Sequence, residues 1–217
     1  MKRAVLLTIV VAALTCFCGS GAASQFQFAR RETVLKWDDG VMDAPEDCHL
    51  GTFHDEVAVM FDLPEWATCI TAVQAYLRCE YVVPAGCDLD LRVWAPGELG
   101  GDLPGQIVGG YSNHVIHDTT WSWVTLPLPF PIGIGDSHFH GERRAFVGFR
   151  WGTDSQMCLG LDMTPPCADA TRLCNWHWGT PWGRVQDADA MVRAVVSDEY
   201  VNPVEPSTWT RVKAQFR

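Results

Sequence analysis

The stretch ITAVQAYLRCEY, residues 70–81, alternates apolar and polar side chains over most of its length. One side of an extended chain would carry Val73, Ala75, Leu77, Cys79 and Tyr81, and the other side Gln74, Arg78 and Glu80. Successive side chains of a strand point to opposite faces of a sheet, so this pattern predicts a strand with one buried face. The stretch DLDLRVW, residues 88–94, repeats the pattern and predicts a second strand.

Further segments of strand composition are separated by turns rich in proline and glycine. They are residues 33–37, 56–63, 106–116, 121–128, 145–151, 156–163 and 190–197. No window of a dozen residues after the first 24 residues shows convincing helical periodicity. The sequence therefore predicts an all-β domain over residues 25–197, an antiparallel β-sandwich or jelly roll. An up-and-down barrel is the alternative.

The N-terminus has the pattern of a secretory signal. Lys2 and Arg3 precede an apolar run over residues 4–18, and small residues follow it at 22–24. We expect residues 1–24 to be a signal peptide and the protein to be secreted, periplasmic or at the cell surface. The apolar run is too short to predict a membrane span, and no later segment comes close. A lipid anchor on a cysteine within the run is the alternative.

The charge balance bears on possible partners. The chain has 16 Lys and Arg against 26 Asp and Glu, a formal net charge of −10. Phosphate recognition needs a clustered basic face, and the longest basic cluster is Arg143 and Arg144. Nucleic acid is therefore not an expected partner.

Seven cysteines follow the signal segment: Cys48, Cys69, Cys79, Cys87, Cys158, Cys167 and Cys174. In an exported protein they predict disulfides, with at least one cysteine left over. Cys79 and Cys87 share an inner side on two strands joined by EYVVPAG, which predicts a disulfide across a hairpin. Cys167 and Cys174 bracket ADATRL and are a second predicted pair.

Two tryptophan pairs are candidate ligand platforms. In NWHWGTPWG, residues 175–183, Trp176 and Trp178 would share one face of a strand and His177 the other. Trp121 and Trp123 repeat this spacing. Exposed, such rings suit the C–H face of a sugar; buried, they fill the sandwich. Both interpretations stay open.

Two further groups could bind metal. His138, His140 and Glu142 alternate in HFHGE, so all three would project together toward a transition metal. The spacing resembles the H-x-H of cupins, but the glutamate follows too early and only His177 remains downstream. Asp38 and Asp39 in WDDGVMDAPED, with Asp162, predict a calcium site. Solvent-exposed loops are the alternative for both groups.

The order of several motifs resembles accessory β-sandwich domains of bacterial exported proteins, with a layout similar to carbohydrate-binding modules. These motifs are KWDDG, LRVWAPGELGGDLPGQIV, WSWVTLPLPFPI, AFVGFRW, LGLD and AMVRAVVS, within residues 33–197. The resemblance implies a non-enzymatic binding or surface module, with polysaccharide the leading ligand. A cupin-like metal enzyme centred on His138 and His140 is one alternative. A structural or assembly role at the cell surface is another.

Residues 198–217 change in character and predict a C-terminal tail. Trp209, Val212 and Phe216 would form one apolar stripe if EPSTWTRVKAQFR were a short helix. The tail is predicted either to pack on its own domain or to bind another component of the cell envelope.

Overall fold

The computed structural model describes residues 31–46, 56–79, 86–97, 101–135, 139, 141–151, 157–175 and 180–199. Several predictions concern residues outside these ranges: the signal segment, nearly all of the C-terminal tail, Cys48, His138, His140, Trp176 and Trp178. They stay predictions. Within the described part, no helix is long and apolar enough to cross a membrane.

Thirteen strands make up the described part of the chain. They are β1 (Glu32–Leu35), β2 (Ala44–Glu46), β3 (Glu56–Asp62), β4 (Cys69–Cys79), β5 (Cys87–Pro96), β6 (Pro104–Ile116), β7 (Ser122–Gly133), β8 (Arg144–Trp151), β9 (Met157–Asp162), β10 (Thr171–Asn175), β11 (Thr180–Arg184), β12 (Asp189–Ala190) and β13 (Val192–Ser197). Each predicted strand is present. The strands β2, β10 and β11 have no predicted counterpart, because their short sequences APE, TRLCN and TPWGR do not alternate apolar and polar residues.

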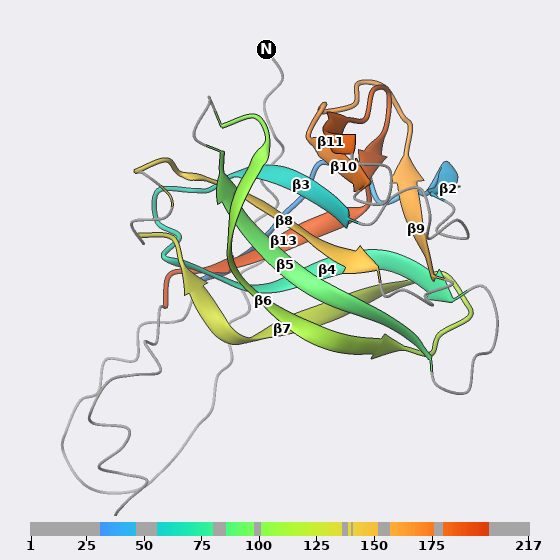
Figure 1. Cartoon of the computed structure of the whole chain (residues 1–217), viewed down its shortest axis with the longest axis horizontal. Helices are drawn as coiled ribbons and strands as arrows, with labels where there is room; N and C mark the ends of the chain where they lie inside the picture. The colour runs from blue at the N-terminus through green and yellow to red at the C-terminus, as the bar shows by residue number, and fades with distance from the viewer. Residues whose placement is uncertain are drawn as a thin grey trace, which may run out of the picture.

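The strands form two antiparallel sheets, which confirms a sandwich (Figure 1). The seven-stranded sheet has the order β1-β13-β4-β9-β12, with β7 paired to β4 and β2 paired to β9. The six-stranded sheet has the order β11-β10-β3-β8-β5-β6. Two separate sheets that enclose a core between them are a sandwich rather than the alternative barrel.

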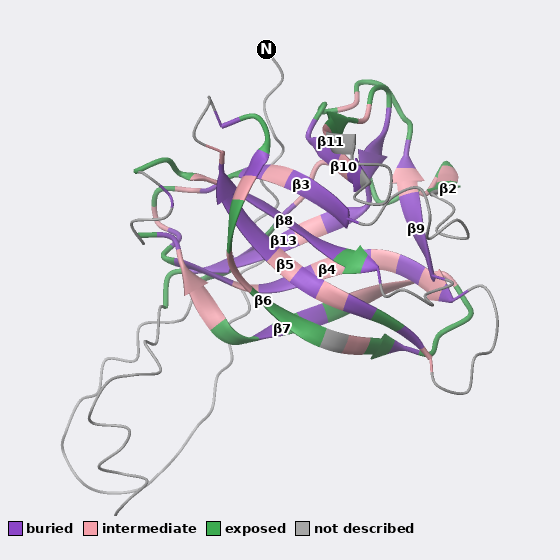
Figure 2. Ribbon diagram, viewed as in Figure 1, coloured by how far each residue is buried: buried purple, intermediate pink, exposed green. Residues whose placement is uncertain are grey.

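The main core lies between the two sheets. Val73, Ala75 and Leu77 of β4 are fully buried in it, whereas Gln74 and Arg78 on the other face are half-buried. Figure 2 shows buried positions along the strands of both sheets. The alternation in the sequence therefore assigned the two faces of β4 as the structure has them.

The predicted hairpin between β4 and β5 is wrong. β4 pairs with β7, β13 and β9, whereas β5 pairs with β6 and β8 in the other sheet. Alternation shows which side of a strand is buried but does not specify which strand it pairs with, so two consecutive alternating strands can belong to different sheets.

Candidate functional site

Three aromatic rings of the seven-stranded sheet and the segment before β7 contact one another, and one of them, Trp121, also packs against the main core. Tyr76 of β4 is in the middle and stacks on Trp121, with ring centroids 5.5 Å apart and 12° between the planes. Trp123 of β7 lies on Tyr76 at 5.4 Å with a 50° tilt. All three side chains are half-buried, so part of this aromatic platform (Trp121, Tyr76 and Trp123) faces solvent.

The strands fix the position of the platform. Tyr76 lies between the core residues Ala75 and Leu77, so it points outward, and the register places it opposite Trp123. The neighbouring strand β9 has Gly160 beside the tyrosine ring. A Cβ at position 160 would lie 2.9 Å from Cδ1 of Tyr76, so only glycine leaves room for the ring in this place.

A hydrogen-bonded turn holds the segment that carries Trp121. The carboxylate of Asp118 accepts hydrogen bonds from the backbone N–H of Thr120 at 3.2 Å, from the Thr120 hydroxyl at 2.8 Å and from the Ser122 hydroxyl at 3.3 Å. These bonds hold the pKa of Asp118 below its usual value, and the bond from the Thr120 hydroxyl has the largest effect. The carboxylate therefore stays ionised at neutral pH and orders the turn before Trp121.

Two arginines lie over the tryptophans of the platform. Cζ of Arg193 in β13 is 3.5 Å from the ring centroid of Trp123, and Cζ of Arg78 in β4 is 5.0 Å from that of Trp121. Arg193 also forms a bidentate ion pair with the buried carboxylate of Asp38, with Nε 3.0 Å from Oδ2. Asp38 thereby fixes Arg193 on Trp123.

The platform includes one predicted tryptophan pair and one residue that the sequence analysis missed. Trp121 and Trp123 were predicted to share a face, and the structure brings them together through Tyr76. Tyr76 lies between Gln74 and Arg78, which were both predicted to point outward. In a strand, residues two apart share a face, so the sequence could have placed Tyr76 on the outer face as well. Whether any of these residues binds a ligand stays a prediction.

The acidic residues predicted for calcium are brought close by the fold and bonded within it. Asp38 pairs with Arg193. The carboxylate of Asp162 accepts hydrogen bonds from the backbone N–H of Asp39 at 2.7 Å and of Thr164 at 2.8 Å. Among the residues that the structure describes, no group of three or more His, Cys, Asp or Glu side chains is arranged to hold a metal ion. The calcium site stays a prediction.

Glu142 is the one member of the predicted transition-metal group that the structure describes. Its side chain is exposed, and its backbone N–H donates to the carbonyl of Phe139 at 2.8 Å. His138 and His140 lie outside the described residues, so the cupin-like arrangement stays a prediction.

The part of the outer face of the six-stranded sheet around Trp94 is covered rather than open. Trp94 of β5 packs with Ala58 and Phe146 in a second, small core, and Trp182 of β11 meets its ring edge-on at 5.4 Å. Three strands separate β11 from β5 in the sheet, so this contact requires the β10–β11 hairpin to fold over the face. Figure 1 shows β10 and β11 raised at one end of the sandwich.

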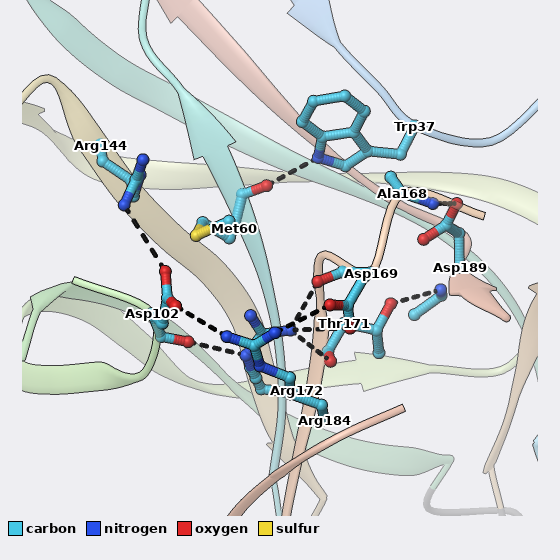
Figure 3. A network of polar contacts seen from close by, with 11 residues as sticks. Trp37, Met60, Asp102, Arg144, Ala168, Asp169, Thr171, Arg172, Arg184 and Asp189 are labelled. Atoms are coloured by element: carbon cyan, nitrogen blue, oxygen red, sulfur yellow. Dashed lines mark hydrogen bonds and ion pairs between the residues drawn. The ribbon is translucent and has the colours of Figure 1, made fainter. Parts of the chain in front are cut away.

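Arg172 of β10 lies at the centre of a polar network beside this small core (Figure 3). Its guanidinium donates to the carbonyls of Asp102 at 2.7 Å, Asp169 at 2.8 Å and Thr171 at 2.9 Å. Arg184 bridges the side chains of Asp102 and Asp169. Burial, and then the nearby Arg184, lower the pKa of Arg172. The network ties the segment at residue 102 to the β10–β11 hairpin.

The predicted Cys79–Cys87 pair is brought together, although not in a hairpin. Cys79 ends β4 in one sheet and Cys87 begins β5 in the other. Both are thiols in the structure and they contact one another, while Sγ of Cys79 lies 2.9 Å from the carbonyl oxygen of Ile116. Burial, and then Cys87, raise the pKa of Cys79 to about 12. A disulfide here stays a prediction, and it would link the two sheets.

The other predicted pair lies in a different setting. Cys167 is half-buried, with Sγ 4.0 Å from the carbonyl oxygen of Thr164. Cys174 is buried in β10, opposite Glu56 of β3. The segment between them is not simply a loop, because residues from Thr171 onward form β10. Their pairing stays a prediction.

Comparisons with known proteins assign no family. No family model and no curated protein matches the chain. A structure of the cysteine protease and lectin-like domains of a surface-layer-associated protein of Clostridium difficile is similar with a TM-score of 0.45 and 6% identity, over 76% of this chain and 36% of that chain. The VP2 subviral particle of infectious bursal disease virus is similar with a TM-score of 0.27 and 11% identity, over 95% of this chain and 52% of that chain. Likenesses this distant assign no function.

Proposed function

We propose that this protein is an exported, non-enzymatic β-sandwich module that binds carbohydrate through the aromatic platform. The contiguous rings of Trp121, Tyr76 and Trp123 carry the proposal, because all three are partly exposed. A pyranose presents apolar C–H groups that pack against such rings, while its hydroxyls need nearby hydrogen-bonding groups. Gln74 and Thr125, which hydrogen-bond to each other at 3.2 Å, lie one step along the same two strands.

The way the rings are held supports binding rather than incidental exposure. Tyr76 and Trp123 belong to paired strands, the Asp118 turn holds the segment of Trp121, and Arg193 is fixed over Trp123 by Asp38. A surface that is already ordered loses little conformational entropy when a ligand binds. The platform is therefore suited to weak ligands such as sugars, which offer few strong contacts.

Affinity electrophoresis tests this proposal. The protein is run through gels that contain xylan, mixed-linkage β-glucan or galactan. We expect at least one polysaccharide to retard the chain, and Trp121→Ala or Trp123→Ala to remove the retardation. Trp66→Ala is the matched control, because Trp66 is also half-buried and also has an arginine, Arg31, over its ring at 4.0 Å. This control should be retarded like the unmodified protein.

Two results would overturn the proposal. One is that no polysaccharide in the panel retards the protein. The other is that Trp66→Ala weakens binding as much as Trp121→Ala does, because the loss would then reflect a general loosening of the fold. Circular dichroism of each variant separates this second case from unfolding.

A further inference from the structure

The two arginines of the platform differ in what already binds them. The guanidinium of Arg193 donates hydrogen bonds to both carboxylate oxygens of Asp38, so its charge is compensated within the fold. No ion pair joins Arg78 to a carboxylate among the described residues, and its Nε is buried without a hydrogen-bond partner there. Nε itself is closed to solvent, but the side chain as a whole is half-buried, so a ligand can reach the rest of this guanidinium, which has no carboxylate partner among the described residues.

We infer that the platform takes a sugar that carries a carboxylate, a uronic acid, and that Arg78 binds this carboxylate. The inference rests on the proposed carbohydrate function and names the ligand class for the same site. A guanidinium matches a carboxylate with two parallel hydrogen bonds, a fit that a neutral hydroxymethyl group does not offer. A planar acceptor with two oxygens also suits a single guanidinium better than a tetrahedral anion, which needs donors from several sides.

The position of Arg78 makes the two contacts compatible. Its Cζ lies over the ring of Trp121, 5.0 Å from the centroid, and Tyr76 stacks on the same ring, so a ligand that contacts the exposed edge of Trp121 comes close to the guanidinium. In a uronic acid the carboxylate extends from the edge of the pyranose and leaves the C–H groups free to meet the rings. Trp121 and Arg78 would therefore bind different parts of one sugar residue.

The net charge of the chain favours a short acidic ligand over a long one. With a formal net charge of −10, the protein repels a long polyanion, whereas a short acidic oligosaccharide meets mainly the local field of Arg78. The test accordingly uses oligosaccharides rather than polymers. Oligogalacturonides, alginate oligomers and oligoglucuronides are each compared with their own carboxyl-reduced form, which has the same linkages without the acid.

Binding is measured by titration of the intrinsic tryptophan fluorescence. We expect at least one acidic oligosaccharide to bind about 10- to 100-fold more tightly than its carboxyl-reduced form, the range of a charge-assisted hydrogen-bonded pair. Arg78→Gln should remove this difference while the reduced oligosaccharide still binds. Arg78→Lys should retain part of it, because lysine keeps the charge but lacks the fork. Arg150→Gln, which removes an exposed charge on the other sheet, should leave the ratio unchanged.

Each contrary result has its own meaning. If the reduced oligosaccharides bind as tightly as the acidic ones and Trp121→Ala abolishes both, the platform binds sugar but the uronic acid inference is wrong. The inference also fails if the preference for the acid survives in Arg78→Gln. If neither form of any oligosaccharide binds, the carbohydrate function fails and this inference fails with it.

Discussion

Trp123 on the seven-stranded sheet and Trp94 on the six-stranded sheet both point away from the main core, and both meet another aromatic ring. Their surroundings differ. Trp94 is only 2% exposed, because the β10–β11 hairpin places Trp182 against it. Trp123 stays half-buried beside Tyr76 with Arg193 over its ring. Both residues are tryptophans, so the residue type does not explain the difference. A tryptophan is core packing where another segment, here the β10–β11 hairpin, covers its ring, and it is available to a ligand where no segment does.

The arginines of the two faces differ in the same way. Arg172 donates to three backbone carbonyls and is 1% exposed, so its hydrogen-bonding capacity is largely used inside the fold (Figure 3). Arg78 is half-buried, with Nε unbonded to any described residue. An arginine whose donors hold the backbone stabilises the fold, whereas a half-buried arginine without a carboxylate partner beside partly exposed rings can recognise a ligand.

The largest effect that tests this comparison comes from the two tryptophans. Trp94→Ala should lower the free energy of unfolding by about 3–5 kcal/mol, because truncation leaves a cavity among Ala58, Phe146 and Trp182. Trp123→Ala should cost about 1 kcal/mol, since a half-buried ring loses less packing. Urea unfolding measures both values. Equal losses would show that the platform is packing and not a binding surface.

The two sheets and their buried sides followed from alternation in the sequence. The buried side chains of β4, from Val73 to Leu77, form one inner side, and each predicted strand has its counterpart. Alternation reports the environment of each side chain within one strand. It carries no information on which strand pairs with which, and this is why β4 and β5 were wrongly joined as a hairpin.

Two of the three rings of the platform could be predicted from sequence. Trp121 and Trp123 were found because two tryptophans at i and i+2 share a face. Tyr76 lies more than forty positions away, and only the register of β4 with β7 brings it between them. The cover over Trp94 was missed because it depends on where the β10–β11 hairpin folds, a tertiary event with no periodic signal.

The second test compares the arginines. Arg172→Met should cost about 2–4 kcal/mol, because the carbonyls of Asp102, Asp169 and Thr171 lose a charged donor inside the fold. The same change at Arg78 should cost within about 0.5 kcal/mol, since no described residue depends on its Nε. Thermal and urea unfolding of the two variants measure the difference. A costly Arg78→Met would mean that Arg78 holds the fold and is not available for a ligand.

The smallest effect concerns Asp189 of β12, a strand of the seven-stranded sheet that lies beside Ala168 and Thr171 near the polar network (Figure 3). Its Oδ2 accepts a hydrogen bond from the backbone N–H of Ala168 at 2.7 Å, while Oδ1 is buried and has no partner in the described part of the chain. Burial, and to a smaller extent the charges of Asp162 and Asp38, raise the pKa of Asp189. The described residues therefore compensate the ionised form of Asp189 at only one of its two oxygens.

Asp189→Asn should stabilise the protein by about 1 kcal/mol near neutral pH, because the amide keeps an acceptor for Ala168 and removes the buried charge. A carboxylate whose pKa is raised by folding contributes stability below its unfolded pKa and loses that contribution as the pH rises through the folded pKa. The gain should therefore be present above the raised pKa and disappear below the unfolded one. Urea unfolding between about pH 4 and about pH 8 measures it.

The control is Asp88→Asn, which changes an exposed carboxylate on β5 and should show no such pH-dependent gain. If Asp189→Asn destabilises the protein at neutral pH instead, the ionised carboxylate is compensated after all. The charge of Asp189 would then stabilise the fold rather than weaken it.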